Sequence, residues 1–236
     1  MPVLTMKRSS GSEAPRPGRF RDLAVRAVSS VVMAPLALAA VWYDFPWFDL
    51  LVAFATVLMV AEWRRMVGGL RRPGWLAIGY AYITLAVLAA FWIRHDAKVG
   101  LLTFLWLMAA VWATDIFAFF AGRTFGGRKL APVLSPNKTW SGLAGGVTAA
   151  ALVSIAFAVW ASANWLWLAV WGVLTALAAQ TGDLAESAMK RRFGVKDSGH
   201  LIPGHGGILD RVDGLLAALL FLAAVRLLGG GAVPWN

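Results

Sequence analysis

Cysteine is absent from the 236-residue sequence, histidine occurs only three times, and charged residues are scarce. The absence of cysteine excludes disulfide bonds, thiolate metal sites and cysteine nucleophiles. Charged residues make up 14% of the chain, whereas a soluble domain carries roughly 25%. The scarcity of charge argues against an ordinary soluble domain with a large core.

Apolar residues are abundant instead: 59% of the chain is hydrophobic, and it contains thirteen tryptophans. Several apolar runs reach about 20 residues, the length of a helix that crosses a bilayer. Tryptophan is enriched at membrane–water interfaces, so we interpret these rings as interface anchors and expect no nucleic-acid partner. The sequence therefore predicts an all-α polytopic membrane protein.

About seven transmembrane helices are predicted, and the long loops have room for one or two further short or re-entrant helices. Residues 1–22 form a polar flexible tail, which lacks the cleavage pattern of a signal peptide. Residues 23–121 hold the N-terminal spans, and residues 122–236 form a C-terminal catalytic part with signature loops. The segment 62–74 is read as a basic loop. The predicted spans are 23–42, 47–63, 75–93, 101–121, 143–160, 165–181 and 208–228.

Lysine and arginine are distributed unevenly between the loops of this ladder. With the N-terminus inside, nineteen cations fall on inside segments, and only Arg94 and Lys98 fall on outside links. This bias predicts an N-inside, C-outside topology with both long polar loops on the cytoplasmic face. The net charge of +10 indicates contact with anionic membrane lipids, or equally a substrate that carries phosphate.

The most polar long window is 182–213, just before the last apolar run. Asp210 and Asp213 are three residues apart, so a helix places both on one face. A helix cap would explain one acid, but two acids with Arg211 between them and glycines ahead favour a metal or phosphate site. The glycine run 204–207 supplies backbone N–H groups that could meet phosphate oxygens. His205 in this run is either a structural hydrogen-bond partner or an acid or base.

Other polar residues leave alternatives open. Asp183 directly follows a predicted span, and is either the polar end of a helix or a ligand for Mg²⁺, which prefers carboxylate oxygens. Asp115 lies in an apolar run and should face the bundle interior, where it binds metal, pairs with a lysine or lines an ion path. Residues 135–139 read as a turn followed by a helix cap. Four cations bind either phosphates or lipid headgroups: Lys190, Arg191, Arg192 and Lys196.

Acids, cations and glycine-rich loops on one membrane face suit phosphoryl or nucleotidyl transfer, in which metal and cations stabilise charge on phosphates. The residues alone name neither the nucleotide nor the lipid.

The sequence resembles the phosphatidate cytidylyltransferase (CDP-diacylglycerol synthase) family along a long motif. The motif reads S-x-x-K-R, then K-D-x-G, then P-G-H-G-G-x-x-D-R-x-D, between Ser187 and Asp213. Upstream, Gly182-Asp183-Leu184, Asp115 and the run S-P-N-K-T-W at 135–140 are also similar, so the resemblance covers about residues 110–228. Ser141 departs from the family, which commonly has glutamate there.

The resemblance implies that CTP and phosphatidate react to CDP-diacylglycerol and pyrophosphate with Mg²⁺. It also suggests a second, monovalent cation such as K⁺, a homodimer, and an active site on the cytoplasmic side of a bacterial inner membrane. The implied metal ligands are Asp183 and Asp210. The implied catalytic residues are Ser187, Lys190, Arg211 and Asp213. The implied substrate-binding residues are Asp115, Ser135, Lys138, Lys196, Asp197, His205, Gly206 and Gly207.

Two other functions compete with this one. A CTP-dependent polyprenol or phytol kinase would also be a multi-span protein with basic loops. A secondary transporter would use Asp115 and the other acids as ion sites, but its usual pair of related halves is not visible in the sequence.

Overall fold

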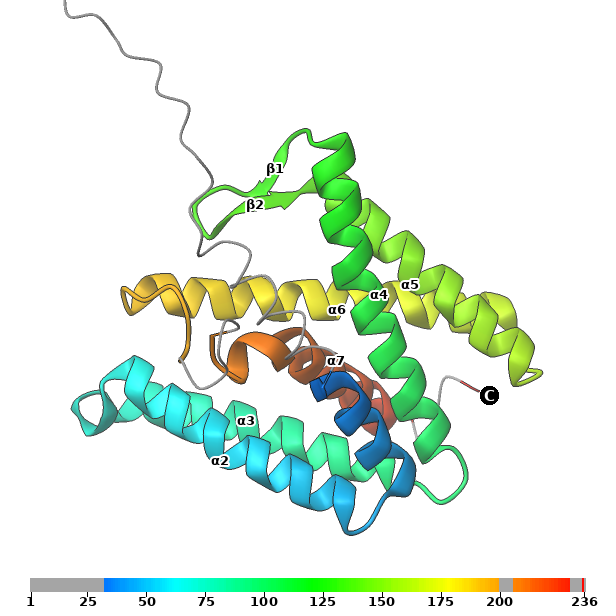
Figure 1. The fold of residues 1–236 in the computed structure, drawn as a ribbon, viewed down its shortest axis with the longest axis horizontal. Coiled ribbons are helices and arrows are strands. Elements are labelled where there is room, and N and C mark those ends of the chain that lie inside the picture. The colour runs from blue at the N-terminus through cyan, green and yellow to red at the C-terminus, as the bar shows by residue number, and fades with distance from the viewer. Residues whose placement is uncertain (1–31, 200–205, 230–234, 236) are drawn as a thin grey trace, which may run out of the picture.

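The computed structural model describes residues 32–199, 206–229 and 235, most of which are helical (Figure 1). The predicted tail 1–22, the first part of the span predicted at 23–42, and His205 lie outside the described residues. In chain order the elements are the helix Val32–Tyr43, α2 (Trp47–Val67), the 3₁₀ turn η1 (Gly69–Arg71), α3 (Pro73–Arg94), α4 (Gly100–Phe125), β1 (Lys129–Ala131), β2 (Ser135–Thr139), α5 (Trp140–Trp160), α6 (Trp165–Arg192) and α7 (Leu209–Leu228).

Four helices, α3 to α6, are long and apolar enough to cross a membrane. This finding confirms that the chain is mostly helical with apolar helices of membrane-spanning length, as predicted. The predicted spans at 47–63 and 208–228 form as α2 and α7, but charged side chains lie in their end turns, such as Asp49 in α2 and Arg226 in α7. Seven spans and their orientation therefore stay predictions.

The basic loop predicted at 62–74 is wrong in its first part. Helix α2 continues to Val67 and ends at Gly68, whose φ of 84° lets its N–H bond the carbonyls of Arg64 and Arg65. The two arginines lie in the last turn, where cations interact favourably with the helix dipole. As a result, Glu62 lies inside a helix and is completely buried.

A short hairpin interrupts the helices between α4 and α5. Strands β1 and β2 are antiparallel, with Lys129 opposite Thr139, and they extend sideways from the junction of α4 and α5 (Figure 1). Gly126 and Gly127, with φ of 59° and 94°, turn the chain after α4. The helix cap predicted here is confirmed, because Thr139 Oγ1 accepts the N–H of Gly142 at 3.0 Å. The turn predicted at 135–139 is wrong, because these residues form strand β2, and the all-α prediction missed the hairpin.

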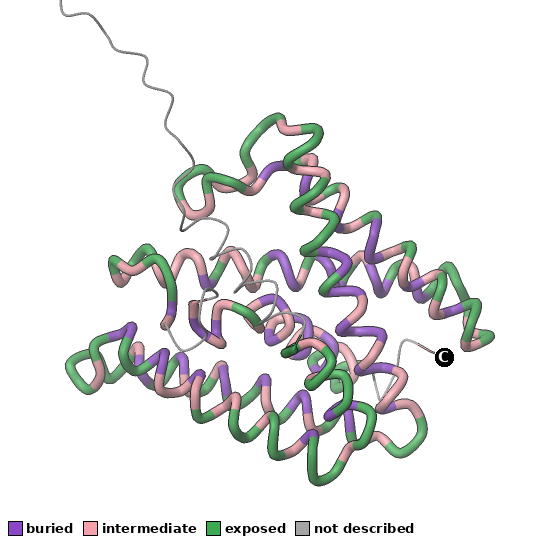
Figure 2. Tube along the Cα trace, viewed as in Figure 1, coloured by how far each residue is buried: buried purple, intermediate pink, exposed green. Residues whose placement is uncertain are grey.

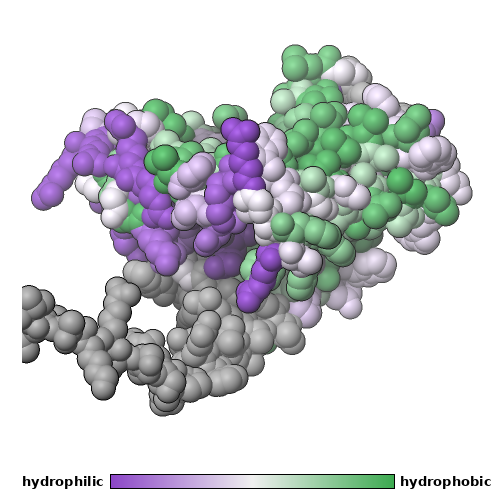
Figure 3. Space-filling view, turned by 90° about the horizontal axis from the view of Figure 1, so that it is seen from above, coloured by the Kyte–Doolittle hydropathy of each residue, from purple (hydrophilic) through white to green (hydrophobic). Residues whose placement is uncertain are grey.

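Helices α4 and α5 pack closely because glycines of α5 face α4. A Cβ added at Gly142 would lie 2.8 Å from the carbonyl oxygen of Ala118, and one at Gly146 would lie 2.7 Å from that of Thr114. Buried residues follow the facing sides of the helices (Figure 2). Large apolar side chains such as Phe117 remain exposed, as expected on a surface that contacts lipid. On the face shown in Figure 3, apolar side chains gather on the right and hydrophilic ones on the left.

Asp96 closes the loop between α3 and α4. Its Oδ1 accepts the N–H groups of Lys98 (2.9 Å) and Val99 (3.1 Å), and its Oδ2 pairs with Arg226 of α7. The N–H donors of Val99 and Lys98 lower the pKa of Asp96 below its ordinary value, against the effect of burial, and Arg226 adds to this. The stabilisation from Asp96 is therefore present above the ordinary aspartate pKa and is lost as the pH falls through the lowered value.

We expect Asp96→Asn to lower the free energy of unfolding by about 1 to 3 kcal/mol at neutral pH, because hydrogen bonds to a charged acceptor are lost. The difference from the wild type should shrink as the pH falls below the ordinary aspartate pKa, and should vanish once the pH has passed the lowered pKa of Asp96, where both proteins carry a neutral side chain. Thermal unfolding of detergent-purified protein measures it. A pH-independent difference would contradict the assignment to charge.

Candidate active site

A cavity of about 850 Å³ lies between α4, the hairpin, α5, α6 and the start of α7. Acids and cations line it together, so it offers both carboxylate oxygens for a metal and positive charge for phosphates. Its acids are Asp115, Asp183, Asp197, Asp210 and Asp213, and its cations are Arg123, Lys129, Lys138, Lys190 and Arg211.

Lys190 joins α6 to α7 at the edge of this cavity. Its Nζ donates to Asp210 Oδ1 at 2.7 Å and to Glu186 Oε2, one turn earlier in α6, at 2.9 Å. All three side chains are largely buried, with exposed fractions of 13% for Lys190, 8% for Asp210 and 7% for Glu186. Because water screens these charges little, removal of one partner leaves the others uncompensated.

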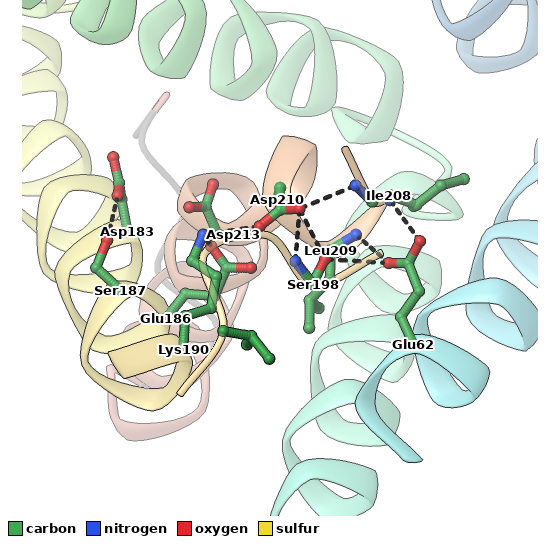
Figure 4. A network of polar contacts seen from close by, with 12 residues as sticks. Glu62, Asp183, Glu186, Ser187, Lys190, Ser198, Ile208, Leu209, Asp210 and Asp213 are labelled. Carbon is green, nitrogen blue, oxygen red and sulfur yellow. Dashed lines mark hydrogen bonds and ion pairs between the residues drawn. The ribbon is translucent and has the colours of Figure 1, made fainter. Parts of the chain in front are cut away.

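The carboxylate of Asp210 is fixed from a second side by backbone. Its Oδ2 accepts the N–H and the hydroxyl of Ser198 and the N–H of Gly207, each at 2.9 Å (Figure 4). Gly206 has a φ of 80°, and a Cβ there would approach Asp210 Oδ2 to 2.9 Å. The described part of the glycine run thus lies close to the carboxylate of Asp210. This close approach explains structurally why glycine occurs here.

A second series of polar side-chain contacts runs along the cavity from the hairpin to α4. Lys138 of β2 pairs with Asp183 of α6 at 2.5 Å and donates to Gln180 Oε1 at 3.1 Å. Gln180 Nε2 in turn donates to Asp115 Oδ1 at 3.4 Å. Ser187 lies one turn after Asp183 and its hydroxyl donates to Asp183 Oδ1 at 3.5 Å. Asp115 thus lines the cavity as an exposed residue, and Gln180 links it to Lys138.

Glu186 and Asp213 bring two carboxyl groups together between α6 and α7. Among the described residues, no N–H or O–H group donates to the buried Glu186 Oε1, whose neighbour is the carboxyl group of Asp213. Asp213 Oδ1 accepts the N–H of Gly214 at 2.8 Å. Two acids in contact require a shared proton or a nearby cation. Within the described residues no group of three or more His, Cys, Asp or Glu side chains is arranged to hold a metal ion. The acids nevertheless fit Mg²⁺, which is often held by one or two carboxylates and completed by substrate phosphates and water.

Most of the predicted site residues lie together. Gly207 bonds Asp210 directly. Five predicted residues are not among the described residues that line the cavity, and their roles stay predictions: Ser135, Ser187, the exposed Lys196, Gly206 and Gly207. The predicted residues that line the cavity are Asp115, Lys138, Asp183, Lys190, Asp197, Asp210, Arg211 and Asp213.

Several polar residues of this region were not assigned to the site from the sequence, among them Arg123, Lys129, Asn137, Glu186, Ser198, Gln180 and Glu62. Gln180 is the polar residue one turn before Asp183 in an otherwise apolar run, and that spacing on one helix face was the signal that could have found it. Glu62 reaches the same region from α2, and no local sequence pattern predicts this contact.

Known proteins resemble this chain over most of its length. The sequence model of the cytidylyltransferase family matches residues 69–228. The phosphatidate cytidylyltransferase of Brucella abortus biovar 1 (strain 9-941) is 47% identical over 173 residues, which cover 73% of this chain and 62% of that protein. The phosphatidate cytidylyltransferase of Rickettsia felis is 35% identical over 226 residues, which cover 87% of this chain and 93% of that protein. The chain thus spans less than two thirds of the Brucella relative and nearly all of the Rickettsia one.

Proposed function

The chain belongs to the cytidylyltransferase family, and from that premise we propose that it is a phosphatidate cytidylyltransferase. It transfers the cytidylyl group of CTP to phosphatidate, giving CDP-diacylglycerol and pyrophosphate. The observation that carries this proposal is the cavity in which Lys138, Asp183, Lys190 and Asp210 meet beside apolar helices. A charged nucleotide and a lipid phosphate both find matching surfaces there.

The reaction needs one substitution at phosphorus. A phosphate oxygen of phosphatidate attacks the α-phosphorus of CTP, the bond from that phosphorus to the bridging oxygen breaks, and pyrophosphate leaves. The attacking oxygen is already ionised, so no strong general base is required. Lys138, Lys190 and Arg211 hold the phosphates and stabilise the charge that moves onto the leaving pyrophosphate.

Mg²⁺ is part of the proposal. Asp183 and Asp210 would hold it, with Asp213 in support, and the bound ion would neutralise charge on the phosphates of CTP. Lys138 and Lys190 contact these two carboxylates in the structure, so each lysine lies where it can pass from a carboxylate to a substrate phosphate. A second, monovalent cation such as K⁺ would meet negative charge at Glu186 and Asp213.

The membrane arrangement extends this proposal. Seven spans, an N-inside orientation, a cytoplasmic active site and a bacterial inner membrane follow from the cation distribution and the family. The tail 1–22, the division between 23–121 and 122–236, and a homodimer belong to the same proposal.

Removal of divalent cations should abolish the activity, because phosphate charge is then left to the protein cations alone. We expect chelation with EDTA to reduce CDP-diacylglycerol formation by roughly 100-fold or more, and excess Mg²⁺ to restore it. K⁺ alone should not restore it. Full activity after exhaustive chelation would refute the metal part of the proposal and leave the transfer itself intact.

An exchange of acceptors tests the reaction type. The purified protein should convert CTP with phosphatidate and not with an isoprenoid alcohol. Conversion with the alcohol alone would favour the polyprenol or phytol kinase, and substrate flux across vesicles without CTP turnover would favour the transporter.

A further inference from the structure

Glu62 connects the N-terminal half of the chain to the start of α7. It lies near the end of α2, and its exposed fraction is 0%. Its Oε1 accepts the N–H of Ile208 and its Oε2 that of Leu209, both at 2.9 Å. The hydroxyl of Ser198 lies 3.4 Å from Oε2 (Figure 4). These partners are between 136 and 147 positions away in sequence.

The contacts of Glu62 match the needs of a helix start. The first N–H groups of a helix have no partner within it, and negative charge is stabilised at that end. Helix α7 begins at Leu209, so Glu62 supplies from another helix the acceptor that a local capping side chain would supply. A carboxylate buried as deeply as this one is tolerated because several donors bind it.

Glu62 and Asp210 accept hydrogen bonds from neighbouring backbone N–H groups of the same turn. Three consecutive N–H groups point at the two carboxylates: Gly207 binds Asp210, while Ile208 and Leu209 bind Glu62. The Ser198 hydroxyl lies between the carboxylates, 2.9 Å from Asp210 Oδ2. Any shift of the turn relative to Glu62 therefore shifts the donors that fix Asp210.

The glycines around Glu62 indicate that this arrangement is tightly built. A Cβ at Gly199 would lie 2.7 Å from Glu62 Oε1. A Cβ at Gly207 would lie 2.7 Å from Glu62 Oε2 and 2.2 Å from the Ser198 hydroxyl oxygen. Part of the glycine-rich motif thus serves to admit the carboxylate of Glu62. Nearby, Trp63 and Met59 of α2 belong to the same buried apolar cluster as Leu209.

We propose that Glu62 is a positioning residue of the active site, which sets the carboxylate of Asp210 by holding the first turn of α7 and the Ser198 segment. The expected effect of Glu62 on kcat rests on the proposed function, because it requires that Asp210 takes part in the reaction. It makes α2 part of the working site although α2 contributes no lining residue among those described.

The test is Glu62→Gln in the purified full-length protein. Glutamine keeps the shape but replaces one acceptor oxygen by an NH₂ donor, which then faces the N–H of Ile208 or Leu209. We expect kcat to fall about 10- to 100-fold, as for partners that orient a ligand, with the KM for CTP changed less than about 3-fold. Amide exchange should rise at Gly207, Ile208 and Leu209. In an Asp210→Asn background, Glu62→Gln should lower kcat by less than about 2-fold further. Both substitutions act through the carboxylate of Asp210, which the background variant has already removed.

Leu168→Ala is the matched control for stability. Leu168 is completely buried near the start of α6, and its truncation should destabilise the protein by about 2 to 5 kcal/mol without raising amide exchange selectively at 207–209 or lowering kcat. If Glu62→Gln does not accumulate, Gly207→Ala replaces it, since its Cβ collides with the same groups.

The outcomes separate the two proposals. A wild type without cytidylyl transfer removes the proposed function, while amide exchange still reports whether Glu62 holds the turn. An active wild type in which Glu62→Gln keeps kcat within about 2-fold, or loses it additively with Asp210→Asn, overturns the positioning role.

Discussion

Replacing Asp210 by asparagine is expected to reduce kcat for CDP-diacylglycerol formation by roughly 10³-fold. The change keeps the size of the side chain and removes its charge. Asp210 then loses its ion pair with Lys190, and Oδ1 can no longer serve Mg²⁺ as an anionic ligand. The backbone donors of Ser198 and Gly207 can still reach the amide oxygen, so the turn should persist and the protein should accumulate in the membrane.

Asp96→Asn is the control for this variant. It makes the same chemical change in a partly buried ion pair, with Arg226 of α7, in the loop between α3 and α4. Its activity per folded molecule should equal that of the wild type. Asp183→Asn should resemble Asp210→Asn. If either active-site variant retained wild-type kcat, that acid could not be a metal ligand.

Replacing Lys190 by methionine should damage both stability and chemistry. Methionine fills much of the same space, but Glu186 and Asp210 are left buried without their shared cation. Removal of one member of a buried charge group costs about 3 to 5 kcal/mol, which unfolding in detergent can measure. We also expect kcat to fall roughly 10²-fold at temperatures where the variant is folded, because a positive charge beside the phosphates is lost.

Arg226→Met separates the two effects. It removes the cation from the pair with Asp96, so it should lower stability and leave kcat unchanged. A Lys190→Met enzyme that is as active per folded molecule as Arg226→Met would limit Lys190 to a structural role.

Local patterns in the sequence were sufficient to predict much of this molecule. Apolar runs near bilayer length located α3 to α6, because a helix that contacts lipid needs uninterrupted apolar residues. The three-residue spacing of Asp210 and Asp213 predicted two acids on one helix face. Lys138 of the hairpin contacts Asp183 of α6, and the side of the membrane on which these segments lie stays a prediction.

The missing parts depend on contacts between distant residues. Glu62 stands beside a basic run, so its local context indicates a loop, and only its bonds to Ile208 and Leu209 explain why it is buried in a helix. Strand β1 is three residues long, too short for a periodic pattern, and it exists because β2 pairs with it. Gln180 did have a local signal, one turn from Asp183, but its link to Asp115 joins two helices.

The position of the label in the product tests the central claim most directly. Purified protein is given phosphatidate, Mg²⁺ and CTP labelled at either the α- or the γ-phosphate. The proposed transfer predicts that α-label enters the lipid and that γ-label leaves as pyrophosphate. Neither labelled lipid nor labelled pyrophosphate should form when phosphatidate is omitted. Entry of γ-label into the lipid, or no dependence on phosphatidate, would contradict cytidylyl transfer at this site.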